Sequence, residues 1–134
     1  MTAPKMIFVN LPVRDLDATK AFFAALGFTF NPQFTDHNAA CMVVSDSIFV
    51  MLLVEPFFEG FTNKPLCDAR SRTEVITCLS ADSRAEVDRL VDAALAAGAS
   101  EPMPARDLGF TYQRGVQDLD GHLWEIAHMD GEPG

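Results

Sequence analysis

The stretch "VNLPVRDLDATKAFFAALGF", residues Val9 to Phe28, decides the fold because it joins a strand pattern directly to a helix pattern. From Ile7 to Val13 every second residue is apolar, which is typical of a strand with one buried face. Asp15 follows, and its carboxylate is well placed to cap a helix. That helix has an apolar stripe and ends at Gly27; the stripe consists of Leu16, Thr19, Phe22, Phe23 and Leu26.

The remainder of the N-terminal half has the composition of strands. Residues Phe28 to Phe34 are expected to be extended. The runs "AACMVVS" (39–45) and "SIFVMLLVE" (47–55) are rich in apolar residues and meet at Asp46. Two such runs separated by a polar turn predict a β-hairpin.

The same order of elements returns in the C-terminal half. The run "EVITCLSAD" (74–82) predicts another strand, and Ser83 with Glu86 has the spacing of a helix capping box. The second helix then has its own apolar stripe, formed by Val87, Leu90, Val91 and Ala94, and Gly98 ends it. The runs "GFTYQRGVQ" and "HLWEIAHM" flank "DLDG" (118–121), in which Gly121 can adopt positive φ, so they predict a second hairpin.

This pattern predicts an α+β fold built from two βαβββ modules, residues 5–55 and 73–131, within one domain of 134 residues. Residues 56–72 are the expected connecting arm, and their three phenylalanines indicate a packed segment. A helix covers only one face of a small sheet, so the other face must meet the second module or another chain. We therefore expect a curved sheet around a cleft between the modules, a common place for small-molecule sites.

The composition excludes several classes of function. The net charge of −9 and a pI near 4.5 argue against binding to nucleic acid or to anionic membranes, and mildly favour neutral or cationic ligands. No apolar run is long enough to span a membrane, and the N-terminus lacks the pattern of a signal peptide. Three cysteines without a CxxC pair are typical of a reducing cytoplasm, where we expect the protein.

Val9–Phe28 followed by "DLDGHLWEI" (118–126) resembles the vicinal oxygen chelate superfamily. Its members include glyoxalase I, extradiol dioxygenases, fosfomycin-resistance transferases and bleomycin-resistance proteins. The chain is most similar to the branch described as glyoxalase- or bleomycin-resistance-like. The resemblance implies paired βαβββ modules, a site in the cleft between them and frequent homodimers.

The resemblance also implies where a metal would bind in metal-dependent members. Glu125 matches one ligand position, but two others hold Phe8 and Ile76, and the strand at 47–54 offers no strong ligand. A catalytic divalent centre needs about three protein ligands. We therefore predict no metal, and only if one is present (Zn, Ni, Mn or Fe) would Glu125 bind it. His122 and His128 lie three residues from Glu125, an odd offset that sets them on the opposite face of a strand.

An ionised carboxylate between Trp124 and Ile126 needs a partner. The candidates for Glu125 are Arg114 and Tyr112 on the neighbouring strand, with Asn10 as a further neutral donor. Glu125 is then either a structural anchor or a residue that recognises a ligand. Asp107, in "DLGF", is expected to cap a turn. The complete set of candidate ligand-binding residues is Glu125, Tyr112, Arg114, Asn10, Phe8, Phe49 and Met51.

Three functions fit these observations. The favoured one is metal-independent binding of a small, partly apolar or cationic molecule by a homodimer. The alternative is a metal-dependent lyase, dioxygenase or transferase that uses Glu125 as a ligand, and the third is a structural or regulatory protein. The sequence has none of the motifs GxxxxGK[ST], GxGxxG and GxSxG, so phosphate-binding loops and serine hydrolase elbows are unsupported.

Overall fold

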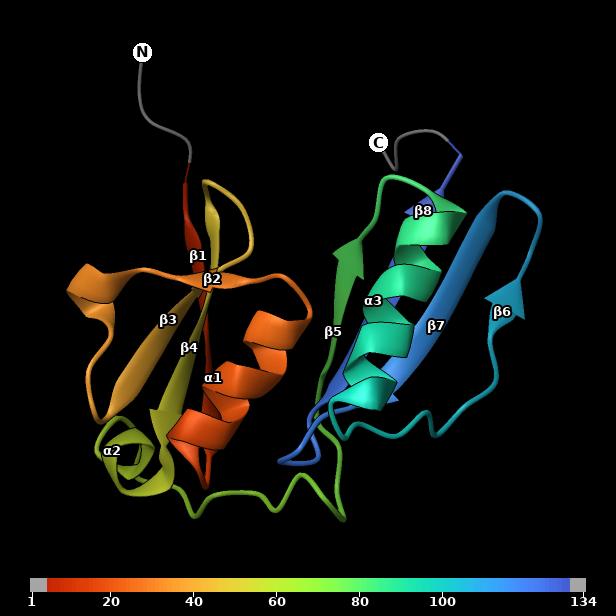
Figure 1. The fold of residues 1–134 in the computed structure, drawn as a ribbon. Helices are drawn as coiled ribbons and strands as arrows, with labels where there is room; N and C mark the ends of the chain where they lie inside the picture. Colours follow the sequence, from red (N-terminus) through yellow and green to blue (C-terminus); the bar gives the residue numbers. More distant parts are fainter. Residues whose placement is uncertain (1–4, 131–134) are drawn as a thin grey trace. The chain divides into compact units, whose positions relative to one another are not determined.

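The computed structural model describes residues 5–130, which form two compact units with a boundary between Cys67 and Asp68 (Figure 1). This boundary lies inside the 56–72 segment. Among residues 5–130, no helix has the length and apolar character needed to cross a bilayer. Each unit has its own four-stranded sheet, its own long helix and its own buried core.

The first unit contains a four-stranded mixed sheet, sheet A. Along the chain the elements are β1 (Ile7–Val13), α1 (Leu16–Ala25), β2 (Thr29–Phe30), the 3₁₀ helix η1 (Pro32–Phe34), β3 (Ala39–Val43), β4 (Ile48–Val54) and α2 (Glu55–Glu59). The strand order is β1-β4-β3-β2, with β1 parallel to β4 and the other pairs antiparallel. This is the predicted βαβββ module.

The helix α1 forms as the sequence predicts. The Asp15 carboxylate accepts a hydrogen bond from the Ala18 N–H at 3.1 Å, which satisfies a donor that the first turn leaves open. The buried residues of α1 are Leu16, Thr19, Phe22 and Phe23. Val13, Val50 and Leu52 are buried on the strands beside it, and all lie on one face of sheet A. The core of the first unit therefore lies between α1 and that face.

One local prediction in this unit is wrong, and one short helix was not predicted. Residues Phe28 to Phe34 do not form one extended run: only Thr29–Phe30 is a strand, and Pro32–Phe34 is a 3₁₀ helix. The proline fixes φ near the helical value and cannot donate to a strand partner, and Asn31 caps the helix by accepting from the Gln33 N–H. The helix α2 was also missed, although Pro56 in its first turn is a helix-start signal.

The second unit repeats the topology in sheet B. Its elements are β5 (Ile76–Ser80), α3 (Arg84–Ala96), β6 (Arg106–Asp107), β7 (Thr111–Gln117) and β8 (Leu123–Met129). The strand order is β5-β8-β7-β6, again with the first strand parallel to the last and antiparallel pairs beyond. The α+β fold class and the two βαβββ modules are confirmed.

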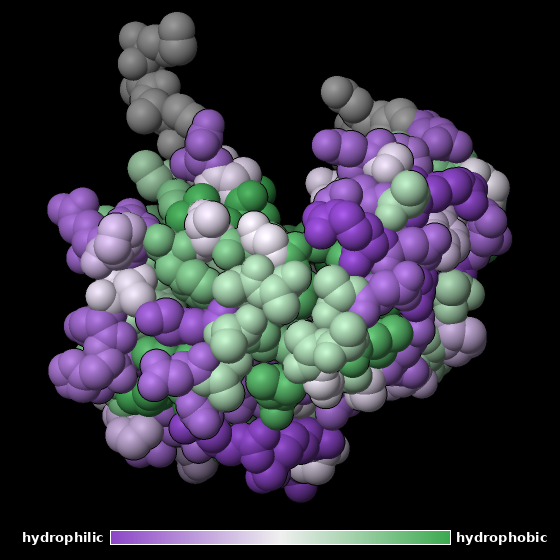
Figure 2. Space-filling view, in the orientation of Figure 1, coloured by the Kyte–Doolittle hydropathy of each residue, from purple (hydrophilic) through white to green (hydrophobic). Residues whose placement is uncertain are grey.

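The helix α3 covers one face of sheet B. Ser83 caps it by accepting from the Glu86 N–H at 3.0 Å, while the Glu86 carboxylate pairs with Arg89, so the capping box is completed on one side. The predicted stripe, Val87, Leu90, Val91 and Ala94, is buried. Hydrophilic residues dominate the opposite surface over the N-terminal turns of α3 (Figure 2).

The turn between β7 and β8 is held by a buried carboxylate. Asp118 accepts hydrogen bonds from the N–H groups of Asp120 and His122 and from Nε1 of Trp124, at 2.9–3.0 Å. Burial raises the pKa of Asp118. Gly121 has a φ of +93°, as the predicted turn requires. Since this turn sets the register of β7 against β8, it also decides which side chains share a face with Glu125.

Candidate functional site

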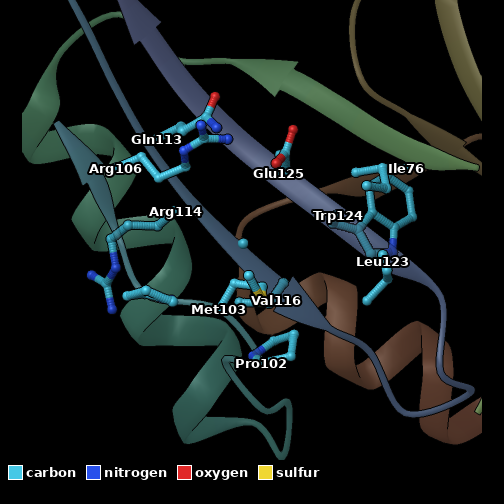
Figure 3. Close-up of a pocket in the computed structure, with 12 residues that line it drawn as sticks. Ile76, Pro102, Met103, Arg106, Gln113, Arg114, Val116, Leu123, Trp124 and Glu125 are labelled. Carbon is cyan, nitrogen blue, oxygen red and sulfur yellow. The ribbon is translucent and has the colours of Figure 1, made fainter. Parts of the chain in front are cut away.

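A pocket lies in the second unit, on the face of sheet B that α3 does not cover (Figure 3). Its cavity volume is about 70 Å³. The loop Pro102–Pro104 forms one wall. The sheet contributes residues from all four strands that share this face, which we call the open face of sheet B: Ile76, Arg106, Gln113, Gly115, Leu123 and Glu125.

Glu125 occupies the centre of this open face. On one side it lies opposite Gly115 of β7, and on the other it lies opposite Cys78 of β5. Its side chain is half-buried, and within residues 5–130 it makes no hydrogen bond or ion pair. Burial and the nearby Glu125 carboxylate both raise the pKa of the Cys78 thiol. Glu125 therefore presents an unneutralised carboxylate to the pocket.

The predicted pair between Arg114 and Glu125 is wrong. Arg114 lies opposite Ile126, not Glu125, so its side chain extends to the α3 side of the sheet. There its guanidinium donates to Glu101 at 2.9 Å, to Asp88 at 3.0 Å and to Asp92 at 3.1 Å. Its side chain is only 13% exposed, and these carboxylates raise the pKa of Arg114.

Tyr112 lies two residues before Arg114 on β7, so its side chain is also on the α3 side of the sheet and is not a partner of Glu125 either. It lies opposite His128, and its hydroxyl donates to Asp88 at 2.7 Å, which raises the pKa of Tyr112. The Arg84 guanidinium lies 5.2 Å from the centre of the Tyr112 ring, in a cation–π contact. Tyr112 and Arg114 therefore fasten α3 to sheet B. Both line a second, more polar surface hollow beside the loop 101–105, and Arg114 is also among the residues that line the pocket of Glu125.

The expected position of His128 is confirmed. Its ring lies on the α3 side of the sheet, with Nδ1 3.0 Å from the Ala81 carbonyl oxygen and Nε2 3.2 Å from Asp130. The turn-capping role of Asp107 is confirmed as well, because its carboxylate accepts from the Gly109 N–H at 3.0 Å. Arg84 also pairs with Asp107 and, with that backbone bond, lowers the pKa of Asp107 to about 2.

The other candidate residues lie in the first unit. Phe8 is paired with Phe49 and Asn10 with Met51, so all four share one face of sheet A, which we call the open face of sheet A. The rings of Phe8 and Phe49 are stacked, with centroids 4.9 Å apart and an interplanar angle of 13°. Asn10 uses its amide Nδ2 to donate to the Phe8 carbonyl at 3.3 Å. This surface is therefore aromatic and carries no ionised side chain from these four residues.

The two sheets have equivalent positions, which tests the metal-ligand set implied by the fold. Counted back from the N-caps Asp15 and Ser83, Phe8 is equivalent to Ile76 and Asn10 to Cys78. By strand pairing, Met51 is then equivalent to Glu125. Phenylalanine and isoleucine offer no lone pair to a cation, and the Met51 thioether is a poor ligand for hard divalent ions.

The donor set therefore does not fit a divalent metal centre. Glu125 is the one carboxylate at the ligand positions given by this equivalence. Residues 5–130 contain no group of three His, Cys, Asp or Glu side chains arranged to hold an ion.

Sequence reasoning missed Arg106, Gln113 and Gly115. The choice between odd and even positions of β7 depends on the length of the turn at 118–122, and the sequence leaves that register open. A signal was present in Gly115, because glycine inside a strand often marks a place where another group approaches the backbone. Arg106 lies in the two-residue strand β6, which has no periodic pattern.

Comparisons with known proteins agree with this architecture. The family model described as bleomycin resistance protein-like N-terminal matches residues 5–45. The comparison with curated protein sequences gave no significant match. Among the similar solved structures is a hypothetical protein from S. aureus, with 26% identity, 95% of both chains covered and a TM-score of 0.78. A glyoxalase/bleomycin resistance protein/dioxygenase family enzyme from Burkholderia phytofirmans has 19% identity, with 94% of this chain and 99% of that chain covered and a TM-score of 0.76. The fosfomycin resistance protein FosX from Listeria monocytogenes has 18% identity, with 98% of this chain and 97% of that chain covered and a TM-score of 0.69.

The chain thus has the two-module fold of glyoxalase/bleomycin resistance proteins. Its N-terminal module matches the bleomycin resistance protein-like family, and the resemblance to the vicinal oxygen chelate superfamily is confirmed.

Proposed function

We propose that this protein binds a small, partly apolar molecule in the pocket on the open face of sheet B, without a metal ion. The observation that carries the proposal is the half-buried Glu125 carboxylate, which lines the pocket and has no hydrogen-bond or ion-pair partner within residues 5–130. A charge partly withdrawn from water is costly unless donors face it. A ligand with an ammonium, amide or hydroxyl donor would supply them.

The remaining wall favours a partly apolar ligand. Ile76, Leu123 and Met103 line the same cavity, and Ile76 is 53% exposed, an unusually open position for this residue type. Covering these side chains would remove apolar surface from water, which favours binding by roughly 25 cal/mol per Å² before the costs of association. The apolar wall and the single acid together suit a small molecule with a donor group at one end.

The open face of sheet A is a separate proposed contact surface. The stacked rings of Phe8 and Phe49, flanked by Asn10 and Met51, would suit a planar ligand group. We also propose that the protein is a homodimer, because both sheets expose large apolar side chains, among them Phe8 at 50% and Ile76 at 53%. Sedimentation equilibrium tests that state directly. A cytoplasmic location stays a prediction.

The proposed function is tested by binding measurements on two matched variants. A library of small amines, amides and alcohols is screened by thermal shift, and hits are confirmed by ¹⁵N NMR. A bound ligand should raise Tm by mass action and shift the amide signals of Gly115 and Glu125. Glu125→Gln should weaken binding roughly tenfold or more, since a charge-assisted hydrogen bond is lost. The control Glu59→Gln changes an exposed carboxylate on α2 and should leave binding unchanged.

The same assay separates binding from metal chemistry. Zn²⁺, Ni²⁺, Mn²⁺ and Fe²⁺ are each added to the wild type and to Glu125→Gln. A Tm increase that depends on Glu125, together with near-stoichiometric metal in the purified protein, would contradict the proposal and favour a lyase, dioxygenase or transferase. A library without any hit that moves the Gly115 and Glu125 signals would also contradict it.

A further inference from the structure

The pocket contains a second charge that the proposed function does not use. The Arg106 side chain lines the cavity and, like Glu125, makes no hydrogen bond or ion pair within residues 5–130. Within residues 5–130 the two opposite charges form no ion pair with one another. Arg106 of β6 lies opposite Gln113 of β7, and Glu125 is on β8, so two strand spacings, roughly 10 Å, separate their backbones. Figure 3 shows both side chains and Gln113 at the same pocket.

The floor between these charges is open because residue 115 has no side chain. Gly115 lies directly opposite Glu125 and lines the cavity. Its backbone does not require glycine, because positive φ occurs at other glycines and not here. A Cβ built at Gly115 would meet the Trp124 carbonyl oxygen at 3.4 Å and Glu125 Cγ at 3.9 Å, which are ordinary contacts. The glycine therefore leaves space in the pocket without being needed by the strand.

We propose that this pocket binds an amphoteric molecule, with an anionic group on Arg106, a cationic or hydrogen-bond donor group on Glu125, and an apolar segment over Gly115. The inference rests on the proposed binding function and specifies its ligand class. A planar guanidinium presents paired donors that match a carboxylate or phosphate. A carboxylate accepts from an ammonium in the same way. The Gln113 amide, between the two charges, can donate to one group and accept from the other.

The two charges also disfavour simpler ligands. A purely cationic ligand would pair with Glu125 and leave Arg106 without a partner, and a purely anionic ligand would do the reverse. Because Arg106 is exposed and Glu125 is half-buried, each such ligand forgoes one charge-assisted hydrogen bond, and only the anionic one also leaves a partly desolvated charge unpaired. Gly115 of β7 lies between Glu125 of β8 and Arg106 of β6, so a ligand whose polar ends reach both charges covers Gly115 with its middle. Ile76 and Leu123 lie on the far side of Glu125 from Arg106 and can contact only the end of such a ligand that pairs with Glu125. The pocket therefore selects for the combination of charges.

Three probes of equal chain length test the ligand class: δ-aminovalerate, which has both charges, pentylamine, which has only the cation, and valerate, which has only the anion. Binding is followed by ¹⁵N NMR of Gln113, Gly115 and Glu125. The dual-charge probe should bind roughly tenfold more tightly than either single-charge probe, because it makes one more charge-assisted hydrogen bond. Equal affinities, or no binding of any probe, would overturn the proposal.

Variants assign each end of the probe. Arg106→Gln should reduce the affinity for δ-aminovalerate to that of pentylamine and leave the affinity for pentylamine unchanged. Glu125→Gln should reduce the affinity for δ-aminovalerate to that of valerate and leave the affinity for valerate unchanged. Gly115→Val should abolish binding of all probes without loss of stability, because a β-branched residue suits a strand interior. An unchanged preference for δ-aminovalerate in Arg106→Gln would overturn the amphoteric assignment. If a ligand from the broad library still binds and Gly115→Val blocks it, the proposed function survives that result.

Discussion

The two units share one topology and differ in what their open faces offer. In sheet A, the strand pair β1–β4 places Asn10 beside Met51 and stacks Phe8 on Phe49. The equivalent pair in sheet B, β5–β8, places Cys78 beside Glu125. One backbone arrangement therefore carries an aromatic surface in one unit and a pocket with charged side chains in the other. The comparison shows that a shared topology does not determine the chemistry of the open face.

The units also differ in how their last hairpins are fixed. The turn before β8 is built around the buried Asp118 and the closely packed Gly121. In the turn before β4, Asp46 is exposed, and the local contacts are hydrogen bonds among Ser45, Ser47 and Ile48. A rigid turn matters more in the second unit, because a slip of one residue would exchange the open face with the α3 face and remove Glu125 from the pocket.

The largest expected effect comes from adding one methyl group to a glycine in each unit. Gly121 and Gly27 both have positive φ, +93° and +104°. A Cβ at Gly121 would lie 2.5 Å from the Arg70 backbone nitrogen, but a Cβ at Gly27 would meet nothing within 4 Å. Gly121→Ala should therefore cost roughly 3–5 kcal/mol, from strain and overlap together, and Gly27→Ala about 1 kcal/mol, from strain alone.

Urea unfolding at equilibrium measures both variants. Equal losses of stability for Gly27→Ala and Gly121→Ala would show that the turn before β8 and the Arg70 backbone move apart at little cost. The contrast between the two hairpins would then disappear.

The buried carboxylate of the second hairpin should give the next effect. Asp118→Ala removes the carboxylate that accepts three hydrogen bonds, from Trp124 Nε1 and two backbone N–H groups, and should cost about 3 kcal/mol. The matched change in the other unit, Asp46→Ala, alters an exposed turn residue and should cost less than about 0.5 kcal/mol. Thermal unfolding compares the two. A red shift of Trp124 fluorescence in native Asp118→Ala would show the loosened turn directly, and an unchanged Tm would contradict the role given to Asp118.

The Arg114 cluster should give a smaller, pH-dependent effect. The hydrogen bond from the Arg114 guanidinium is the main cause that lowers the pKa of Glu101. The pKa of Asp88 is lowered first by the hydrogen bond from the Tyr112 hydroxyl and then by the one from Arg114. A carboxylate whose pKa is lowered by folding stabilises the native state above its ordinary pKa, and this contribution is lost as the pH falls through the folded value. Stability should thus decline below about pH 4.5.

Arg114→Met tests this assignment. It should cost about 1–2 kcal/mol at pH 7, between the values typical of exposed and buried ion pairs. Its stability should also fall less steeply than that of the wild type below pH 4.5. Parallel pH profiles for the two proteins, measured by urea unfolding, would show that Arg114 does not set the pKa values of its neighbours.

Much of the fold could be predicted from the sequence because local signals and periodicity agree. Asp15 and Ser83 cap the helices as expected, and the alternation in Ile7–Val13 gave the correct strand. The exceptions are short elements. The helix α2 spans Glu55–Glu59 and the strand β6 spans Arg106–Asp107, and neither is long enough to show a period.

The site was harder to predict than the fold. Glu125 could be singled out from the sequence, because an acid between Trp124 and Ile126 stands out in any strand register, and its role as a site residue stays a prediction. Its neighbours require knowledge of which β7 residue lies opposite it, and that depends on one hairpin turn. Choosing Arg114 instead of Gly115 is an error of a single residue, yet it replaces an open pocket with an ion pair. Pairing across strands is therefore the information that the sequence lacked.

The smallest expected effect concerns thiol reactivity on the open face of sheet B. Cys78 and Cys67 are both free and exposed, but only Cys78 lies opposite an acid. Burial and Glu125 raise the pKa of Cys78, which lowers its thiolate fraction at neutral pH. Iodoacetamide should therefore modify Cys78 more slowly than Cys67 at pH 7.5, as followed by mass spectrometry of each peptide. Glu125→Gln should accelerate the iodoacetamide modification of Cys78 by roughly two- to threefold, because one nearby negative charge in a partly solvated site shifts a thiol pKa only modestly. The modification rate of Cys67 should stay unchanged and serves as the internal standard. If Cys78 reacts at the same rate in both proteins, the Glu125 carboxylate does not face the thiol, and its central position on the open face of sheet B would have to be abandoned.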